Sequence, residues 1–332
     1  IFVLVFNIPG GFAAVQEFLK QNNGQHLTMF CSGTIPGASL ASNVKTVLSS
    51  EYTIWAALFG STFTTLATHG TDQDMVQRML TATDYKKSRL SLICSGLADL
   101  PIGFIFLTIG ILLNLFYQSH HDAQLPTKTS EIFAYFILKS MPVGLRGLLV
   151  AGIFATAMGS LSAALNALAT SSTRDFYQKK GDGMTGEQSV GAARKFTYIF
   201  AALMILVAST TAYFVIMHPS SRIIPIVLGI FGYTYGSLLG VFLLGILTKN
   251  RGTDQGNCIA MIAGGIFVAL ISGLPNQCLE LLGMPPAPFF AAIPEVSFPW
   301  RIMFGSLLTM AVGALFTRKP GSPDSQSSSD GL

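Results

Sequence analysis

Long apolar runs separated by short polar stretches dominate the pattern of this chain. A run of roughly 18 or more apolar residues is long enough to cross the hydrocarbon core of a bilayer as a helix. The pattern predicts eight membrane segments, at about residues 1–15, 53–70, 91–117, 143–170, 195–217, 223–248, 256–274 and 298–317. The chain is therefore expected to be all-α, a polytopic helical bundle in the lipid bilayer.

The polar stretches divide the predicted bundle into parts. The first apolar run ends at Ile8 and is too short to span, so residues 1–15 are interpreted as the end of a membrane helix that begins before this chain. Residues 16–52 are expected to form an extracellular loop, 53–248 the main helix bundle, 249–317 two further membrane helices, and 318–332 a disordered cytoplasmic tail.

Composition agrees with a membrane protein. Half of the residues are hydrophobic and only 11% are charged, whereas a soluble domain averages about 25% charged residues. The net charge of +4 is scattered and forms no basic block, which leaves a nucleic-acid partner without support. Cys31, Cys94, Cys258 and Cys278 lack the spacing of a metal site. They are interpreted as packing residues, with a Cys31–Cys278 disulfide between outer loops as the alternative.

The basic residues predict an orientation. The loops after residues 70, 170, 248 and 317 hold 13 of the 20 Lys and Arg residues, and the opposite side holds seven. Because Lys and Arg concentrate in cytoplasmic loops, the C-terminus is expected to be cytoplasmic. The protein is accordingly expected to be a multi-pass protein of the plasma or inner membrane.

A polar cassette ends the second predicted membrane segment. It consists of Gly70, Thr71, Asp72, Gln73, Asp74, Met75, Val76, Gln77, Arg78, Met79 and Leu80. In hydrocarbon each unpaired polar group costs several kcal/mol, so such a cassette is expected to line a water-filled cavity or to cap a helix at the interface. Asp72, Gln73 and Arg78 are interpreted as residues that cap the helix and lock a cytoplasmic gate.

Polar side chains within the predicted segments are candidates for a solute path. Ser61, Thr64, Thr65, Thr68 and Asp72 are spaced three or four apart and so form one polar stripe. These hydroxyls either bond back to their own helix or line a cavity, with Thr65, Thr68 and His69 nearest the solute. A lone histidine is, however, more often structural.

Two further candidates lie in other segments. Asp99 is an intramembrane carboxylate, which by default suggests a functional site. It is expected to bind a solute hydroxyl or amine or to pair with a cation, the alternative being a hydrated helix end. Tyr233 and Tyr235, in a glycine-rich segment, are candidates for an outer gate or, alternatively, packing aromatics.

The segment 144–177 carries small residues and hydroxyls at helical spacing. Thr156 and Ser160 fall on one face of a helix, because they are four residues apart. A hard cation such as sodium prefers oxygen ligands, and carbonyls freed at a helix irregularity near Gly152 or Gly159 would add to the hydroxyls. The alternative is simple close packing of helices through small residues.

Three motifs, in order, resemble signatures of the sodium:solute symporter family. They are Gly70-Thr71-Asp72-Gln73 with Val76-Gln77-Arg78; Ala157-Met158-Gly159-Ser160 through Asn166, with Leu168-Ala169-Thr170 and Asp175-Phe176-Tyr177; and Gly240-Val241-Phe242-Leu243-Leu244-Gly245. The resemblance implies a five-plus-five inverted-repeat fold. This chain would hold the end of the first repeat, the second repeat and two accessory helices. The missing N-terminal helices of the same protein would be its partner and would be required for transport.

The same resemblance implies sodium ligands. They match onto the carbonyl of Thr156, Gly159 and the hydroxyl of Ser160. Gly159 stands where a serine is usual and Ala163 where a second serine is common, so one hydroxyl ligand is missing. The carbonyl of Gly159 or a water is the expected substitute.

The expected function is secondary active transport. Sodium would be the coupling ion, with no other cofactor, for symport of a small organic solute by alternating access; a sugar or a monocarboxylate is favoured. The alternatives are a proton-coupled symporter, suggested by Gly159, and a non-transporting sensor or scaffold on the same fold. The sequence holds no Walker, GxSxG, HExxH or CxxC motif, so no enzyme chemistry is indicated.

Overall fold

The computed structural model describes residues 1–20, 30–177, 186–217, 223–281, 283–285 and 287–317. The tail expected to be disordered lies outside these residues. Within them the secondary structure is helical, apart from an isolated β-bridge between Arg251 and Thr317. The all-α expectation is confirmed.

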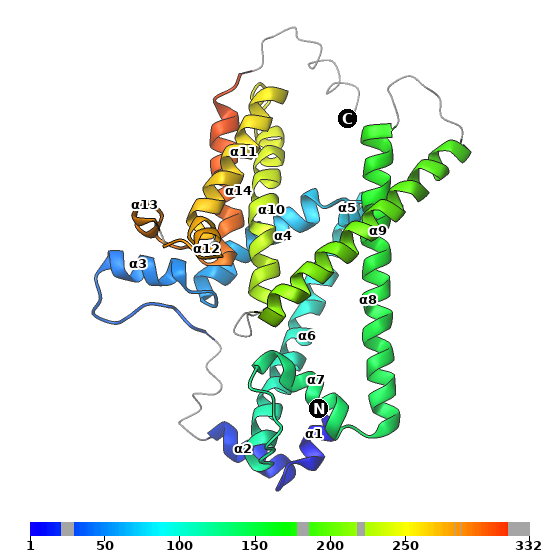
Figure 1. Cartoon of the computed structure of the whole chain (residues 1–332), viewed down its shortest axis with the longest axis vertical. Helices are drawn as coiled ribbons and strands as arrows, with labels where there is room; N and C mark the ends of the chain where they lie inside the picture. Colours follow the sequence, from blue (N-terminus) through cyan, green and yellow to red (C-terminus); the bar gives the residue numbers. More distant parts are fainter. Residues whose placement is uncertain (21–29, 178–185, 218–222, 282, 286, 318–332) are drawn as a thin grey trace. The chain divides into compact units, whose positions relative to one another are not determined.

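The helices follow one another along the chain (Figure 1). They are α1 (Phe2–Asn7), α2 (Gly11–Lys20), α3 (Leu40–Ser49), the π-helical turn η2 (Ala56–Gly60), α4 (Ser61–Thr71), α5 (Gln73–Leu80), α6 (Tyr85–Ser119), α7 (Thr129–Ser140), α8 (Val143–Ser172), the π-helical turn η3 (Thr173–Tyr177), α9 (Gly186–Met217), α10 (Ile223–Leu247), α11 (Asp254–Ile271), α12 (Leu274–Leu281), α13 (Pro288–Ala291) and α14 (Phe298–Ala314).

Among the described residues, five stretches are long and apolar enough to cross a membrane. They are Tyr85–Ser119, Val143–Phe176, Gly186–Met217, Val227–Leu247 and Asp254–Ile271. The segment expected at 298–317 becomes α14, which is 17 residues long. The segment expected at 53–70 becomes η2 and α4. The segment expected at 1–15 is divided in two by Gly10 and Gly11, whose φ angles of 86° and 52° suit glycine and end α1.

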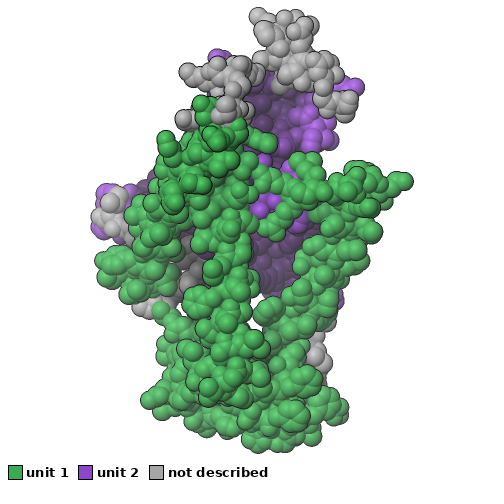
Figure 2. Space-filling view, turned by 90° about the vertical axis from the view of Figure 1, so that its right-hand side faces the viewer, with its two compact units in different colours: residues 1–28, 77–222 green, residues 29–76, 223–332 purple. Residues whose placement is uncertain are grey.

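The chain forms two compact units (Figure 2). Unit 1 comprises residues 1–28 and 77–222, and unit 2 comprises 29–76 and 223–332. The division expected from the sequence, with 53–248 as one bundle and 249–317 as two further helices, stays a prediction. Within unit 2, α4 and α10 pack with α11 and α14.

Small residues bring α10, α11 and α14 of unit 2 into backbone contact. A Cβ added to Gly236 would lie 3.2 Å from the Cα of Gly305, and one added to Gly240 would lie 2.6 Å from the carbonyl oxygen of Ser306. Gly264 of α11 lies against Thr309 in the same way. We call Gly236, Gly240, Gly264, Gly305 and Gly313 the glycine seam. Such small residues let helices approach closely where lipid supplies no hydrophobic drive for association.

Part of the loop expected at 16–52 is fixed to the start of α14. Ser297 Oγ donates to the carbonyl oxygens of Leu48 and Ser50 at 3.1 and 2.9 Å. Trp300 Nε1 donates to Val47 O at 3.3 Å. These bonds satisfy the carbonyls that the last turn of α3 leaves open, so α3 is held on unit 2.

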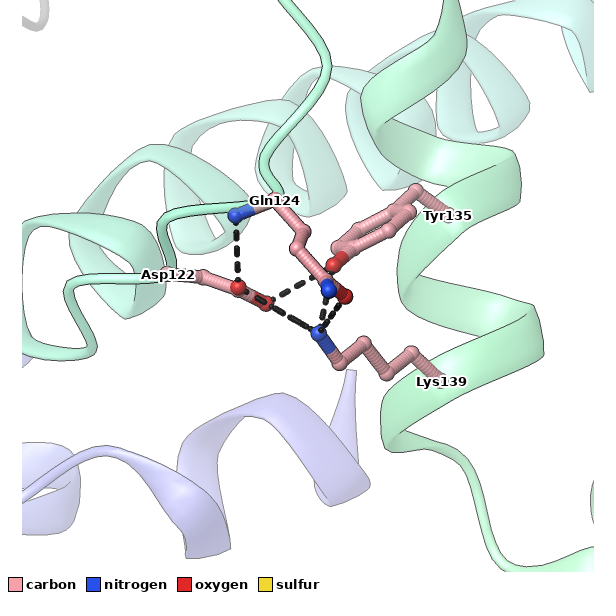
Figure 3. Close-up of polar contacts among 4 residues, drawn as sticks. All are labelled: Asp122, Gln124, Tyr135 and Lys139. Atoms are coloured by element: carbon pink, nitrogen blue, oxygen red, sulfur yellow. Dashed lines mark hydrogen bonds and ion pairs between the residues drawn. The ribbon is translucent and has the colours of Figure 1, made fainter.

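Unit 1 has an apolar cluster and a polar anchor. Leu4 and Ile8 pack with Leu112, Leu113, Phe116 and Phe136, which joins α1, α6 and α7. Asp122, in the loop between α6 and α7, accepts hydrogen bonds from Tyr135 Oη (2.9 Å) and Lys139 Nζ (2.9 Å) (Figure 3). The bond from Lys139, followed by that from the Gln124 backbone, lowers the pKa of Asp122 to about 2.

The long helices α8 and α9 of unit 1 pack against each other and against η3. Their buried residues lie toward the end marked by η3, namely Ala167, Ala169, Ser172 and Ala192. Over the most apolar stretch of each helix, no residue is buried by the described parts of the chain. These stretches are therefore the ones that lipid or other protein segments must cover.

Candidate functional site

The candidate residues are divided between the two units. Thr156, Gly159, Ser160 and Asp99 belong to unit 1; Thr65, Thr68, His69, Gly70, Thr71, Asp72, Gln73 and Tyr233 belong to unit 2. The helix α5 crosses the division, so Gln77 and Arg78 fall in unit 1.

The hydroxyls of α4 largely bond to their own helix. Thr64 Oγ1 donates to Gly60 O at 2.9 Å, and Thr68 Oγ1 donates to Thr64 O at 3.1 Å. His69 Nδ1 lies 3.0 Å from Thr68 Oγ1 and 3.2 Å from Thr65 O. Thr64 and Thr68 thus bond back to their own helix. Thr65 is exposed, and the role of Thr65, Thr68 and His69 in a solute path stays a prediction.

Asp72 joins three elements of unit 2. It is the C-cap of α4, and its Oδ1 accepts the backbone N–H of Asp74 at 2.9 Å at the start of α5. Its Oδ2 accepts the hydroxyl of Tyr235, on α10, at 2.5 Å. A side-chain oxygen that accepts a backbone N–H at a helix start is an N-terminal cap. Asp72 thus does cap a helix, and its role in a cytoplasmic gate stays a prediction.

The two candidate gate tyrosines have different partners. Tyr235 binds Asp72 and packs edge-to-face on Phe231, with ring centroids 5.3 Å apart. Tyr233 Oη lies 2.8 Å from Ser272 Oγ at the C-cap of α11. Both hydroxyls therefore connect α10 to neighbouring helices of unit 2.

The candidate cation residues lie on a continuous helix. Thr156, Gly159 and Ser160 are exposed on α8, and Thr156 Oγ1 donates to Gly152 O at 2.9 Å. The helix irregularity expected near Gly152 or Gly159 is absent, because α8 is α-helical from Val143 to Ser172. The irregular turn comes later, at η3, where the chain carries Asp175-Phe176. The ligand assignment stays a prediction.

Asp99 is exposed on α6, two residues before Pro101 inside the helix. Because proline has no N–H, the carbonyl of Leu97 loses its helical hydrogen bond. Asp99 follows Leu97 by two residues, which is about 200° around the helix, so its carboxylate and this open carbonyl lie on different faces of α6.

Sequence reasoning missed three features near these residues. The π-turn η2 precedes α4, and π-turns occur frequently at functional sites. Gly60, which ends it, lies so close to α14 that a Cβ would be 2.6 Å from Pro299 O. The contacts of Tyr235 with Asp72 and of Tyr233 with Ser272 were also missed, because no local pattern pairs residues so far apart in the chain.

The described residues hold no cluster of three or more His, Cys, Asp or Glu side chains that could bind a metal. The four cysteines are free and exposed, so the alternative of a Cys31–Cys278 disulfide is not realised.

Helices of membrane-spanning length, a polar turn at a helix end and hydroxyls along apolar helices define a multi-pass α-helical membrane protein. The model of the sodium:solute symporter family matches residues 1–264. The chain belongs to this family.

Similar proteins with curated names are transporters. The chain is 29% identical over 222 residues to the sodium/sialic acid symporter NanT of Aliivibrio fischeri, covering 66% of this chain and 43% of NanT. It is 27% identical over 284 residues to the sodium-dependent multivitamin transporter of Oryctolagus cuniculus (82% and 42% covered). It is 27% identical over 247 residues to the sodium-coupled monocarboxylate transporter 1 of Mus musculus (70% and 38% covered). The chain spans about two fifths of the length of these relatives.

Proposed function

We propose that the full-length protein carrying this chain is a sodium-coupled symporter of a small organic solute that works by alternating access. Membership of the sodium:solute symporter family is the observation that carries this proposal. The exposed oxygens of Thr156 and Ser160, four residues apart on α8, support it. Oxygen atoms are the ligands that hard cations prefer.

The proposed ion site uses the Ser160 hydroxyl, the Thr156 carbonyl and an oxygen at Gly159. A Cβ added at Gly159 would meet nothing within 4 Å, so this position has room for a water or for the approach of another helix. Because the described part of α8 is regular, the remaining ligands are expected from protein segments outside this chain.

The proposed solute path uses α4. Thr65, Thr68 and His69 would face the solute, with Asp99 as a further polar contact, and Asp72 to Arg78 would form the cytoplasmic gate. The surplus of Lys and Arg in the loops after residues 70, 170 and 248 supports a cytoplasmic C-terminus. A potential of 100 mV then adds about 2.3 kcal/mol for each charge moved inward.

The proposed solute is a sugar or a monocarboxylate. The relatives named above carry sialic acid, vitamins and monocarboxylates in their names. This range supports a small organic solute and leaves its identity to experiment.

The test is uptake by the full-length protein in proteoliposomes, with radiolabelled sugars and monocarboxylates and with or without an inward sodium gradient. We expect sodium-dependent accumulation of one solute that Ser160→Ala abolishes. Ser171→Ala is the matched control, because eleven residues bring Ser171 back to nearly the same face three turns further on. Uptake that Ser160→Ala leaves unchanged would remove Ser160 from the ion site.

A proton-coupled symporter is the second candidate, favoured by the glycine at position 159. Uptake driven by a pH gradient and indifferent to sodium would establish it. No uptake of any solute, from protein that is folded and correctly inserted, would favour a membrane sensor instead.

A further inference from the structure

Unit 2 contains a small cavity with charged walls that the proposed transport site does not use. Its volume is about 230 Å³, and it lies where α14 begins. The residues that matter for its chemistry are Ser49, Glu51, Glu295, Phe298 and Arg301. Glu295 and Arg301 follow residue 264, where the match to the family model ends, so family membership does not imply this cavity.

Arg301 is held in place on one wall. Its Nε donates to Val296 O at 3.0 Å. Its side chain lies over α10 at two glycines: an added Cβ would be 3.1 Å from the Arg301 guanidinium at Gly229 and 2.8 Å from the Arg301 Cβ at Gly232. The glycines leave room for the arginine, which is half-buried. The guanidinium is therefore positioned by its surroundings and keeps further N–H donors for a ligand.

Two carboxylates stand near the guanidinium without pairing with it. Glu295 lies against Gly273, at the turn between α11 and α12. Glu51 follows α3, whose end is bonded to Ser297. Both carboxylates line the same cavity as Arg301, yet none of the ion pairs within the described residues joins Arg301 to either of them. The cavity thus separates one positive group from two negative ones.

From this arrangement we propose that the cavity binds a small zwitterion, a molecule with an ammonium group and a carboxylate a few bonds apart. Arg301 receives the carboxylate through charge-assisted hydrogen bonds, and Glu51 and Glu295 receive the ammonium group. The two carboxylates would repel a simple anion, and the guanidinium would repel a simple cation. Ligand pockets usually measure about 300–1,000 Å³, so a cavity of this size suits a ligand no larger than a small amino acid.

The cavity shares no residue with the proposed ion site, because all of its walls belong to unit 2 and Thr156 and Ser160 belong to unit 1. Under the proposed orientation it opens on the outer side of the membrane. Its link to the rest of unit 2 is α10, which carries Gly229, Gly232 and Tyr233. The Arg301 side chain lies against Gly229 and Gly232 of α10. A ligand bound to the guanidinium therefore also restricts the contact between Arg301 and α10.

The experiment uses three matched probes: β-alanine, propylamine (its ammonium alone) and propionate (its carboxylate alone). Binding to the purified full-length protein is measured by thermal shift in sodium-free buffer. We expect β-alanine to bind and both single-charge probes to bind at least about tenfold more weakly, the factor for one lost charged hydrogen bond. Equal binding of propylamine or propionate would overturn the zwitterion, as would no binding of β-alanine.

Variants tie the binding to these residues. Arg301→Gln and Glu295→Gln should each weaken β-alanine binding by about tenfold or more. Lys45→Gln, which alters an exposed charge on α3 outside the cavity wall, should leave it unchanged. Should Arg301→Gln fail to fold, Glu51→Gln serves in its place. Ser160→Ala should retain β-alanine binding. Loss of binding in Ser160→Ala, or retention in the cavity variants, would place β-alanine at the transport site and overturn the inference.

Discussion

The helices α10 and α11 of unit 2 and the helices α8 and α9 of unit 1 are similarly apolar but very differently packed. Over the most apolar stretch, 33% of α10 and 28% of α11 is buried, against none of α8 or α9. The same contrast is visible at the glycines. Gly236, Gly240 and Gly264 lie against neighbouring helices, whereas a Cβ at Gly147 or Gly159 would meet nothing within 4 Å. Apolar length therefore predicts insertion into the bilayer, and the close glycine contacts mark the helices that pack together in unit 2.

The largest expected effect comes from filling the glycine seam. Gly240→Ala would place a methyl group 2.6 Å from Ser306 O and from Thr309 Cβ. Overpacking of this kind destabilises by about 1–3 kcal/mol, which outweighs the gain of up to about 1 kcal/mol in helix propensity. Thermal unfolding of the detergent-solubilised full-length protein measures the change.

The controls for this substitution are Gly245→Ala on α10 and Gly147→Ala on α8, where an added Cβ meets nothing within 4 Å. Both should leave the melting temperature unchanged or raise it slightly, because alanine favours the helix. An equal loss of stability in all three variants would contradict the contrast between the two units.

An effect of similar size is expected from the bond that holds α4 to α10. Tyr235→Phe removes a hydrogen bond to a charged group, worth about 1.5–3 kcal/mol, and keeps the ring on Phe231. Asp72→Asn should then add little in the Tyr235→Phe background, and a double-mutant cycle in unfolding free energy measures this coupling. Tyr233→Phe, which loses a neutral bond to Ser272, should cost less. Additive effects of the Asp72 and Tyr235 substitutions would rule the bond out.

The smallest expected effect is in unit 1, at Asp122. The pKa of this carboxyl is lowered from 3.8 to about 2, so its contribution to stability is present above about pH 4 and is lost as the pH falls toward 2. Lys139→Gln removes the main cause and should raise the pKa of Asp122. Carbon NMR titration of the carboxyl measures the shift. Lys128→Gln, which loses an exposed pair with Glu131, should leave the pKa of Asp122 where it is.

The sequence predicted the long helices well because an apolar span is a local property. The expected segments 143–170 and 223–248 agree closely with α8 (Val143–Ser172) and α10 (Ile223–Leu247). Family motifs also led from the residues to the correct family. The division into units was not predictable, since it depends on contacts between helices that are far apart in the chain. Gly236 and Gly245 look alike in sequence, and only Gly236 touches another backbone.

For the candidate site, the sequence predicted the local role of a residue better than its contacts with residues far away in the chain. It singled out Asp72 as a cap, and Asp72 does cap α5. It did not pair Asp72 with Tyr235, because such a contact depends on how helices cross. The sequence predicted a helix irregularity near Gly152 or Gly159. The structure keeps α8 regular at both glycines, and the irregular turn η3 follows Ser172.

The hydrogen bond between Asp72 and Tyr235 can form only late in biosynthesis, after both residues have been added to the chain. The two residues are 163 positions apart, and ribosomes add about 5–20 residues per second. The carboxylate of Asp72 therefore emerges roughly 10 to 30 s before the tyrosine that completes its hydrogen bonds. During that interval Asp72 lacks this partner, and unit 2 can form completely only after α14 has also been made.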